Sequence, residues 1–313
     1  MSKVIYKQDH SKRSWGLLCA LLATMCWAGS YLVSRFFFNS DAVGNIDEWW
    51  SVCLRLCLGA LIFMPVTFGI GKGSWQTFKR NWKKDWKMFV FLAFCTVAEG
   101  SICFVAMKYT TGARASLFAN MAPVFTLIIS VLAAREMLDK RKVCGIILGL
   151  AGVILAAFSR GGDMFSGGTS VTFAGDLMAL ISGIFWALFT VFGGVITSCY
   201  NGVFCTFIYR ICGMIFLIPV LLITGSEITF ALPLSAWLVF MYYALISGGL
   251  AICLWSIAQR YVEPATLGAF GYLSAFCATA FSLVFLKEQL SLNFIFAFIL
   301  ILGGMALAIR QKQ

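Results

Sequence analysis

The chain has 313 residues, of which 61% are hydrophobic and 12% are charged, and its formal net charge is +11. Soluble domains carry about 25% charged residues, and a soluble chain of this composition would leave a large apolar surface in water. The composition therefore excludes a soluble globular protein. The basic residues lie in short loops rather than on one basic face, which argues against nucleic acid as a partner.

Ten segments are long and apolar enough to cross a bilayer as helices, which takes about 20 residues each. The first begins at Trp15 and lacks the small-residue cleavage site of a signal peptide, so we expect it to be retained. Short connections predict that neighbouring helices run antiparallel. The predicted fold is an all-α polytopic membrane protein with spans at 15–38, 49–70, 88–107, 114–134, 143–159, 174–197, 203–224, 237–259, 264–286 and 292–309.

Lysine and arginine indicate which ends of the spans face the cytoplasm. The basic loop 72–87 contains six such residues, whereas the loop 39–48 contains acids and no bases. Because basic loops stay on the cytoplasmic side, we expect 72–87 inside, 39–48 outside and both termini in the cytoplasm. The predicted location is the cytoplasmic (inner) membrane, with the lipid bilayer as the surrounding partner.

The two halves of the chain resemble each other. The segment "GLLCALLATMCWA" (16–28) aligns with "GDLMALISGIFWA" (175–187), and Arg55 with Cys57 aligns with Arg210 and Cys212. The segment "REML" (135–138) aligns with "KEQL" (287–290). We therefore predict two five-helix repeats, 15–159 and 174–309. Since five is odd, the second repeat enters the membrane inverted, and the site is expected near the midplane between the halves.

The ten-helix plan, the paired "W-A" first helices and the "REML"/"KEQL" segments resemble the drug/metabolite transporter superfamily. Within it the chain is most similar to the EamA-type branch, which contains amino acid and metabolite exporters. The resemblance implies a basket of helices one to four and six to nine around a central cavity, with helices five and ten at the periphery. Glycines in "GIILGLAG" (145–152) and "ILGGMALA" (301–308) suit close packing there, within one bundle or, less favoured, against a second protomer.

Charged residues inside predicted spans are the main candidates for function. Glu99 in the third span and Arg55 in the second lie at similar heights by helix rise. One interpretation is a structural ion pair between them. The preferred one is that Glu99 lines the cavity and binds a cationic group or carries a coupling proton, because its repeat partner is Ala251 whereas Arg55 has the partner Arg210. We expect the two arginines on opposite sides of the midplane.

Other residues complete the predicted cavity lining. Asn120 precedes Pro123, which is expected to bend the fourth span and free backbone carbonyls. Three tryptophans lie away from the predicted interfaces, where their rings could stack on a flat or apolar ligand group. The predicted substrate-binding residues are Trp27, Arg55, Glu99, Asn120, Trp186, Arg210, Trp255 and Tyr272.

Twelve cysteines are scattered singly through apolar segments without a Cys-x-x-Cys pair, so we expect small buried hydrophobes rather than disulfides. His10, the single histidine, lies in the N-terminal tail, which excludes histidine-based metal binding and acid–base catalysis. No metal, cofactor or catalytic residue is expected.

The segment "GIGKGS" (69–74) is not a phosphate loop, because it lacks the first glycine of that motif and the serine or threonine that directly follows the lysine. We therefore expect a secondary transporter, not an enzyme, that exports a small organic metabolite such as an amino acid by alternating access. The alternatives are a passive channel or exchanger for metabolites and, less favoured, an intramembrane enzyme.

Overall fold

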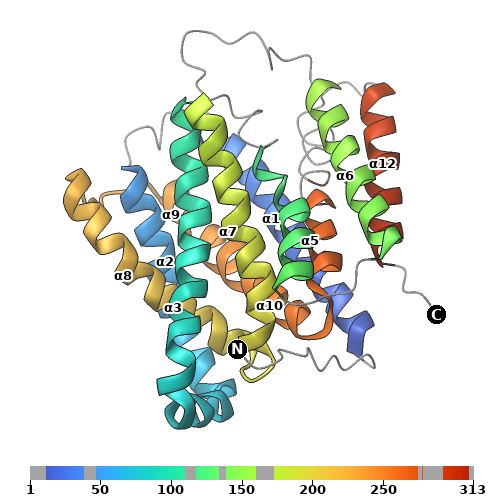
Figure 1. The fold of residues 1–313 in the computed structure, drawn as a ribbon. Coiled ribbons are helices and arrows are strands. Elements are labelled where there is room, and N and C mark those ends of the chain that lie inside the picture. The colour runs from blue at the N-terminus through green and yellow to red at the C-terminus, as the bar shows by residue number, and fades with distance from the viewer. Residues whose placement is uncertain are drawn as a thin grey trace.

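The protein is an assembly of helices that pack side by side (Figure 1). The computed structural model describes residues 12–38, 47–109, 118–133, 139–159, 173–273, 277 and 292–309. Within these ranges all regular structure is helical. Five helices there, counting α9, η3 and α10 as one, have the length and apolar composition of membrane spans. The predicted fold class, an all-α polytopic membrane protein, is confirmed.

The first three helices are α1 (Arg13–Phe38), α2 (Glu48–Ile70) and α3 (Lys72–Tyr109). α2 begins where the Asp47 carboxylate accepts a 2.9 Å hydrogen bond from the amide of Trp50, which satisfies one of the free donors at a helix start. The segment predicted as a basic loop, 72–87, is instead the first part of α3. It contains no proline, and Gly71 alone separates it from α2.

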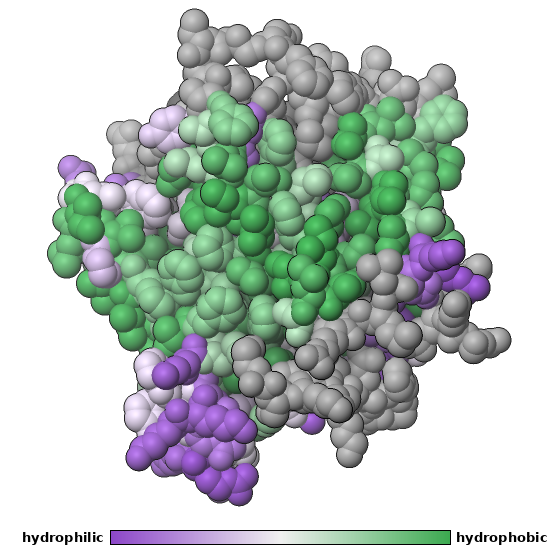
Figure 2. Space-filling view, viewed as in Figure 1, coloured by the Kyte–Doolittle hydropathy of each residue, from purple (hydrophilic) through white to green (hydrophobic). Residues whose placement is uncertain are grey.

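The basic part of α3 extends beyond the apolar body of the molecule. α3 has 38 residues, about 57 Å at 1.5 Å per residue, which exceeds the roughly 30 Å hydrocarbon core of a bilayer. Figure 2 shows apolar side chains across the middle of the molecule and hydrophilic ones at the lower left, where α3 begins. The exposed basic side chains there are Lys72, Lys79, Arg80, Lys83, Lys84 and Lys87.

The next helices are α5 (Ala122–Leu132), α6 (Lys140–Ser159), α7 (Phe173–Thr197) and α8 (Gly202–Thr224). Helical structure also covers 264–273, and α12 spans Leu292–Ile309. The predicted spans 114–134 and 264–286 are therefore described only in part. The segments 135–138 and 287–290 and most of the loop 39–48 lie outside the described residues.

The eighth predicted span is interrupted by a wider turn of helix. It consists of α9 (Leu234–Tyr242), the π-helix η3 (Tyr243–Leu250) and α10 (Ala251–Tyr261). π-helical turns are rare and occur often at functional sites. The Ser247 carbonyl in η3 accepts a 2.9 Å hydrogen bond from the Trp27 indole of α1, so this turn is tied to the first helix.

The start of α1 and the end of α12 lie at the same end of the bundle. Arg13 Nη2 donates to the Ile309 carbonyl at 2.9 Å and lies 3.5 Å from the Glu263 carboxylate. Thr266 donates to the Ala308 carbonyl at 3.3 Å. An even number of antiparallel spans requires this arrangement.

α6 and α12 pack against each other at one edge of the molecule (Figure 1). A Cβ atom added at Gly145 would lie 2.5 Å from the Gly304 carbonyl oxygen, and one at Gly304 would lie 2.8 Å from the Gly149 amide nitrogen. Only glycine permits backbones to approach this closely. The two glycine-rich segments therefore contact each other within one chain, which is the favoured of the two interpretations.

This packing predicts a difference between two adjacent glycines. Gly304→Val should lower the free energy of unfolding by about 1–3 kcal/mol, because the new side chain collides with α6 backbone that cannot move aside. Thermal unfolding in detergent measures the effect. The matched control is Gly303→Val, since a Cβ at Gly303 meets nothing within 4 Å. Equal loss of stability in both variants would contradict the close contact.

Candidate functional site

Three of the predicted residues form one aromatic cluster in the interior. The ring centroids of Trp27 on α1 and Trp186 on α7 are 5.1 Å apart, and that of Trp255 on α10 lies 5.2 Å and 5.6 Å from them. Trp255 is buried, whereas the other two are partly buried. The tryptophan cluster thus joins the first helix to helices of the second half of the chain.

Arg55 and Arg210 meet where α2 packs against α8. Arg210 Nη1 lies 3.3 Å from the Arg55 carbonyl oxygen and donates a hydrogen bond to it. The Arg210 side chain thus reaches the backbone of α2 at its own counterpart in the sequence alignment of the two halves. That the two arginines lie on opposite sides of the midplane stays a prediction.

Two glycines make room for the Arg210 guanidinium. A Cβ at Gly59 of α2 would lie 2.8 Å from Arg210 Nη1, and a Cβ at Gly248 of the π-helix would lie 2.8 Å from Arg210 Cζ. The planar group therefore lies between the bare backbones of two helices. A side chain at either position would push the guanidinium away.

Glu99 lies near Arg55, close enough for their charges to interact. Among the described residues there is no direct salt bridge between them, since the one such pair within 4.0 Å is Arg13 with Glu263. Both side chains lie deep in the bundle and keep some accessible surface. Glu99 also lies near Cys103, one turn further along α3, and Cys103 lies near Ser182 of α7. The carboxylate thus faces the region between α2, α3 and α7.

Asn120 and Tyr272 occupy other surroundings. Asn120 lies in a turn before α5 rather than inside a helix, and Pro123 stands in the first turn of α5. Proline is well tolerated there because the first helical amides lack partners within the helix. Residues 118–119 are helical too, so the helix is interrupted at Asn120, directly before Pro123. Tyr272 is buried against Gly149 of α6, in a peripheral cluster with Ile146, Val153 and Ile301. It is not part of the tryptophan cluster.

Sequence reasoning missed a row of buried polar side chains on α7 and α10. In the described part of the chain no hydrogen-bond partner is found for the side chains of Thr190, Thr197, Ser256, for the Trp255 indole N–H or for the Gln259 carbonyl oxygen. Buried groups of this kind normally have a partner in the protein or in water. Gln259 inside an apolar segment was the available signal.

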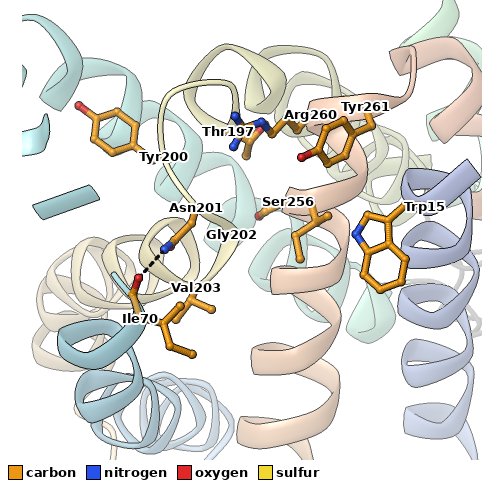
Figure 3. Close-up of a pocket in the computed structure, with 11 residues that line it drawn as sticks. Trp15, Ile70, Thr197, Tyr200, Asn201, Gly202, Val203, Ser256, Arg260 and Tyr261 are labelled. Carbon is orange, nitrogen blue, oxygen red and sulfur yellow. Dashed lines mark hydrogen bonds between the residues drawn. The ribbon is translucent and has the colours of Figure 1, made fainter. Parts of the chain in front are cut away.

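This row leads from the tryptophan cluster to a pocket at one end of the bundle. The Gln259 amide donates to the Phe189 carbonyl at 2.9 Å, one turn from Trp186. Thr197 and Ser256 belong to the pocket wall, which encloses about 310 Å³ between α1, α8 and α10 (Figure 3). Trp15, Val203, Arg260 and Tyr261 contribute to the same wall.

Polar contacts close the same end of the molecule. The Tyr200 hydroxyl donates a 2.6 Å hydrogen bond to the Asp85 carboxylate of α3. Burial, and then this hydrogen bond, raises the pKa of the Tyr200 phenol above its usual range. The Asn201 side chain donates a hydrogen bond to the Ile70 carbonyl at 3.3 Å (Figure 3), and its backbone N–H donates to the Ser74 hydroxyl at 3.0 Å. The α7–α8 turn is thus fastened to α2 and α3.

Removing the Tyr200–Asp85 hydrogen bond is expected to lower the free energy of unfolding, and the contribution of the pair can be measured separately from that of each side chain. Tyr200→Phe should cost about 1.5–3 kcal/mol, because the bond to a charged acceptor is lost while the ring keeps its packing. Thermal unfolding of Tyr200→Phe, Asp85→Asn and the double variant gives the coupling between the two side chains. Ser198→Ala is the control, since Ser198 lies in the same turn and its exposed hydroxyl bonds only locally, to the Val195 carbonyl. Additive losses would contradict the pairing.

Known proteins resemble this chain along most of its length. The sequence model of the EamA-like transporter family matches residues 14–158 and 173–310. The uncharacterized transporter YetK of Bacillus subtilis is 26% identical over 304 residues, 96% of this chain and 89% of that protein. An uncharacterized transporter of Archaeoglobus fulgidus is 26% identical over 279 residues, 87% of this chain and 89% of that protein.

One solved crystal structure shares the fold. It is 18% identical, and it superposes with a TM-score of 0.78 over 95% of this chain and 96% of that chain. The two family matches cover both halves of the chain. The chain belongs to the EamA-like transporter family.

Proposed function

We propose that the protein is a secondary transporter that exports a small organic metabolite, such as an amino acid, across the cytoplasmic membrane by alternating access. The observation that carries the proposal is the interior meeting of charged and aromatic side chains from both halves of the chain. Arg55 and Glu99 come from α2 and α3, whereas Arg210 and Trp255 come from α8 and α10. Intramembrane charges usually mark substrate or ion pathways.

The division into inverted repeats, 15–159 and 174–309, is part of this proposal. A two-fold axis in the membrane plane would pass beside Arg55 and Arg210, since each is the repeat partner of the other and they are in contact. Secondary transporters commonly hold the substrate at such an axis while the halves rock around it. An ion gradient supplies the energy, because the sequence has no phosphate loop.

The pathway on one side of the site runs along α7 and α10. Between the tryptophan cluster and the end pocket lie buried polar groups that have no hydrogen-bond partner among the described residues. Such groups suit a pathway that fills with water when this end opens. Here the contacts of Tyr200 and Asn201 hold the end together. Opening requires these few hydrogen bonds to break, at a net cost of about 0.5–3 kcal/mol each.

The closed end is assigned to the cytoplasm because the exposed basic residues of α3 surround it. Basic segments remain on the cytoplasmic side of membranes. The connection between α8 and α9, which contains the exposed Glu227, lies at the opposite end of α8. It is assigned to the outside.

This orientation predicts which engineered cysteines react from outside the cell. In a cysteine-depleted background, Glu227→Cys should be labelled by a membrane-impermeant thiol reagent on intact cells. Lys79→Cys should react only after the membrane is opened, because α3 begins in the cytoplasm. Labelling of position 79 but not of 227 on intact cells would reverse the orientation.

Transport is tested with purified protein in liposomes, by counterflow and by accumulation under a proton gradient, against amino acids and other small metabolites. Glu99→Gln is expected to fold and insert normally and to lose gradient-driven accumulation, because glutamine keeps the shape of the side chain but cannot exchange a proton. Counterflow survives if Glu99 carries the coupling proton, and falls with accumulation if Glu99 binds the substrate.

The competing interpretation of Glu99 is purely structural. It predicts lower thermal stability of Glu99→Gln, recovery of stability in the double variant with Arg55→Gln, and nearly normal transport kinetics in that double variant. This pattern would contradict a functional role for Glu99. Flux that neither saturates nor exchanges substrate would identify a channel and contradict the transporter.

A further inference from the structure

The interior site has an excess of positive charge. In the part of the chain that the structure describes, the charged groups that interact at this site are the guanidinium groups of Arg55 and Arg210 and the carboxylate of Glu99. Arg55 and Arg210 repel each other, and the Arg210 side chain hydrogen-bonds to a backbone carbonyl rather than to an acid. Two cations that share one carboxylate leave one positive charge without a counter-charge in a setting where charges are expensive.

The geometry keeps the two arginines together, with Arg210 buried and Arg55 keeping some accessible surface. The Arg210 group lies between the backbones of Gly59 and Gly248, and Arg55 Nη2 lies beside Gly100 of α3. Glycine at positions 59 and 248 lets the Arg210 guanidinium fill the space that a side chain there would occupy. Guanidinium groups bind carboxylates and other oxyanions through paired, charge-assisted hydrogen bonds, so such a pair suits an acidic group.

An apolar surface adjoins the charged pair. The Trp27 indole donates to the carbonyl of Ser247, and the next residue, Gly248, contacts the Arg210 guanidinium. In the π-helix, the residue that binds Trp27 therefore directly precedes the residue that contacts Arg210. Indole rings offer flat apolar surface for the remainder of a small organic molecule.

We propose that the transported molecule is an organic anion, and that the guanidinium groups of Arg55 and Arg210 bind its carboxylate while its apolar part lies toward Trp27. The inference rests on the proposed transport function and adds the substrate class. A molecule with one net negative charge neutralises the site, whereas a cation or a neutral amide leaves the excess positive charge in place. In its ionised form Glu99 balances the charge of one of the two arginines, and this leaves its proposed role in proton coupling in place.

The test compares carboxylic acids with their own primary amides. Phenylacetate and phenylacetamide, which differ only in the carboxylate, are added to the purified protein. Thermal unfolding measures binding, and counterflow in liposomes measures transport. The acid is expected to stabilise the protein saturably and to show saturable flux. Its amide should bind about ten-fold more weakly, because a charge-assisted hydrogen bond is lost.

The variants separate the arginine pair from the net charge of the protein. Arg210→Gln and Arg55→Gln are expected to abolish stabilisation by the acid, whereas Lys79→Gln, which removes an exposed cation of α3, leaves it unchanged. Because a buried arginine variant can fail to fold, Gly59→Ala is the second variant. It keeps every charge but displaces the Arg210 guanidinium, so it weakens acid binding, while Gly69→Ala on the same helix, where a Cβ meets nothing within 4 Å, has no effect.

The outcomes distinguish this inference from the transport function itself. Saturable counterflow of amides or amines equal to that of the acids, or no stabilisation by any acid, overturns the anion assignment and leaves the transporter standing. Stabilisation by acids without counterflow of any compound supports the arginine site and contradicts the transport function. Equal binding by wild type and Gly59→Ala also overturns the assignment.

Discussion

The cost of keeping charge in an apolar interior governs the arrangement of this protein. Arg55, Arg210 and Glu99 lie among helices whose outer surfaces are apolar, and each would be strongly destabilising alone in a low-dielectric setting. Their proximity, the carbonyl that accepts a hydrogen bond from Arg210, and the accessible surface that Arg55 and Glu99 keep reduce this cost. The surrounding helices are arranged so that these groups can meet.

Small residues and one irregular helical turn allow that meeting. Gly59 and Gly248 let two backbones lie against the Arg210 guanidinium. The π-helix that contains Gly248 also directs the Ser247 carbonyl toward Trp27, which connects the charged pair to the tryptophan cluster. A regular α-helix across 243–250 would turn these groups differently, so the irregular turn belongs to the site and is not a defect of the fold.

The same molecule contains rigid and yielding contacts in different places. α6 and α12 approach through bare glycine backbone, a contact that tolerates little movement. At the end assigned to the cytoplasm, a few hydrogen bonds of Tyr200 and Asn201 connect the α7–α8 turn to α2 and α3. Hydrogen bonds of this kind can break and reform at modest cost, which suits an end that opens and closes.

The sequence by itself determined the helical membrane class, the resemblance between the two halves and the identity of the residues with buried charge, because apolar segment length and rare intramembrane charges are local properties. It placed the three tryptophans away from the interfaces, and they do meet. It misjudged the helical start of α3, and it placed Asn120 inside a helix where the structure has a turn. It also did not predict that Tyr272 packs against a peripheral helix, or that buried polar side chains form a row through Gln259. Only the tertiary structure decided these points, because helix tilt, side-chain reach and the facing surface of a neighbouring helix depend on contacts between segments far apart in the chain.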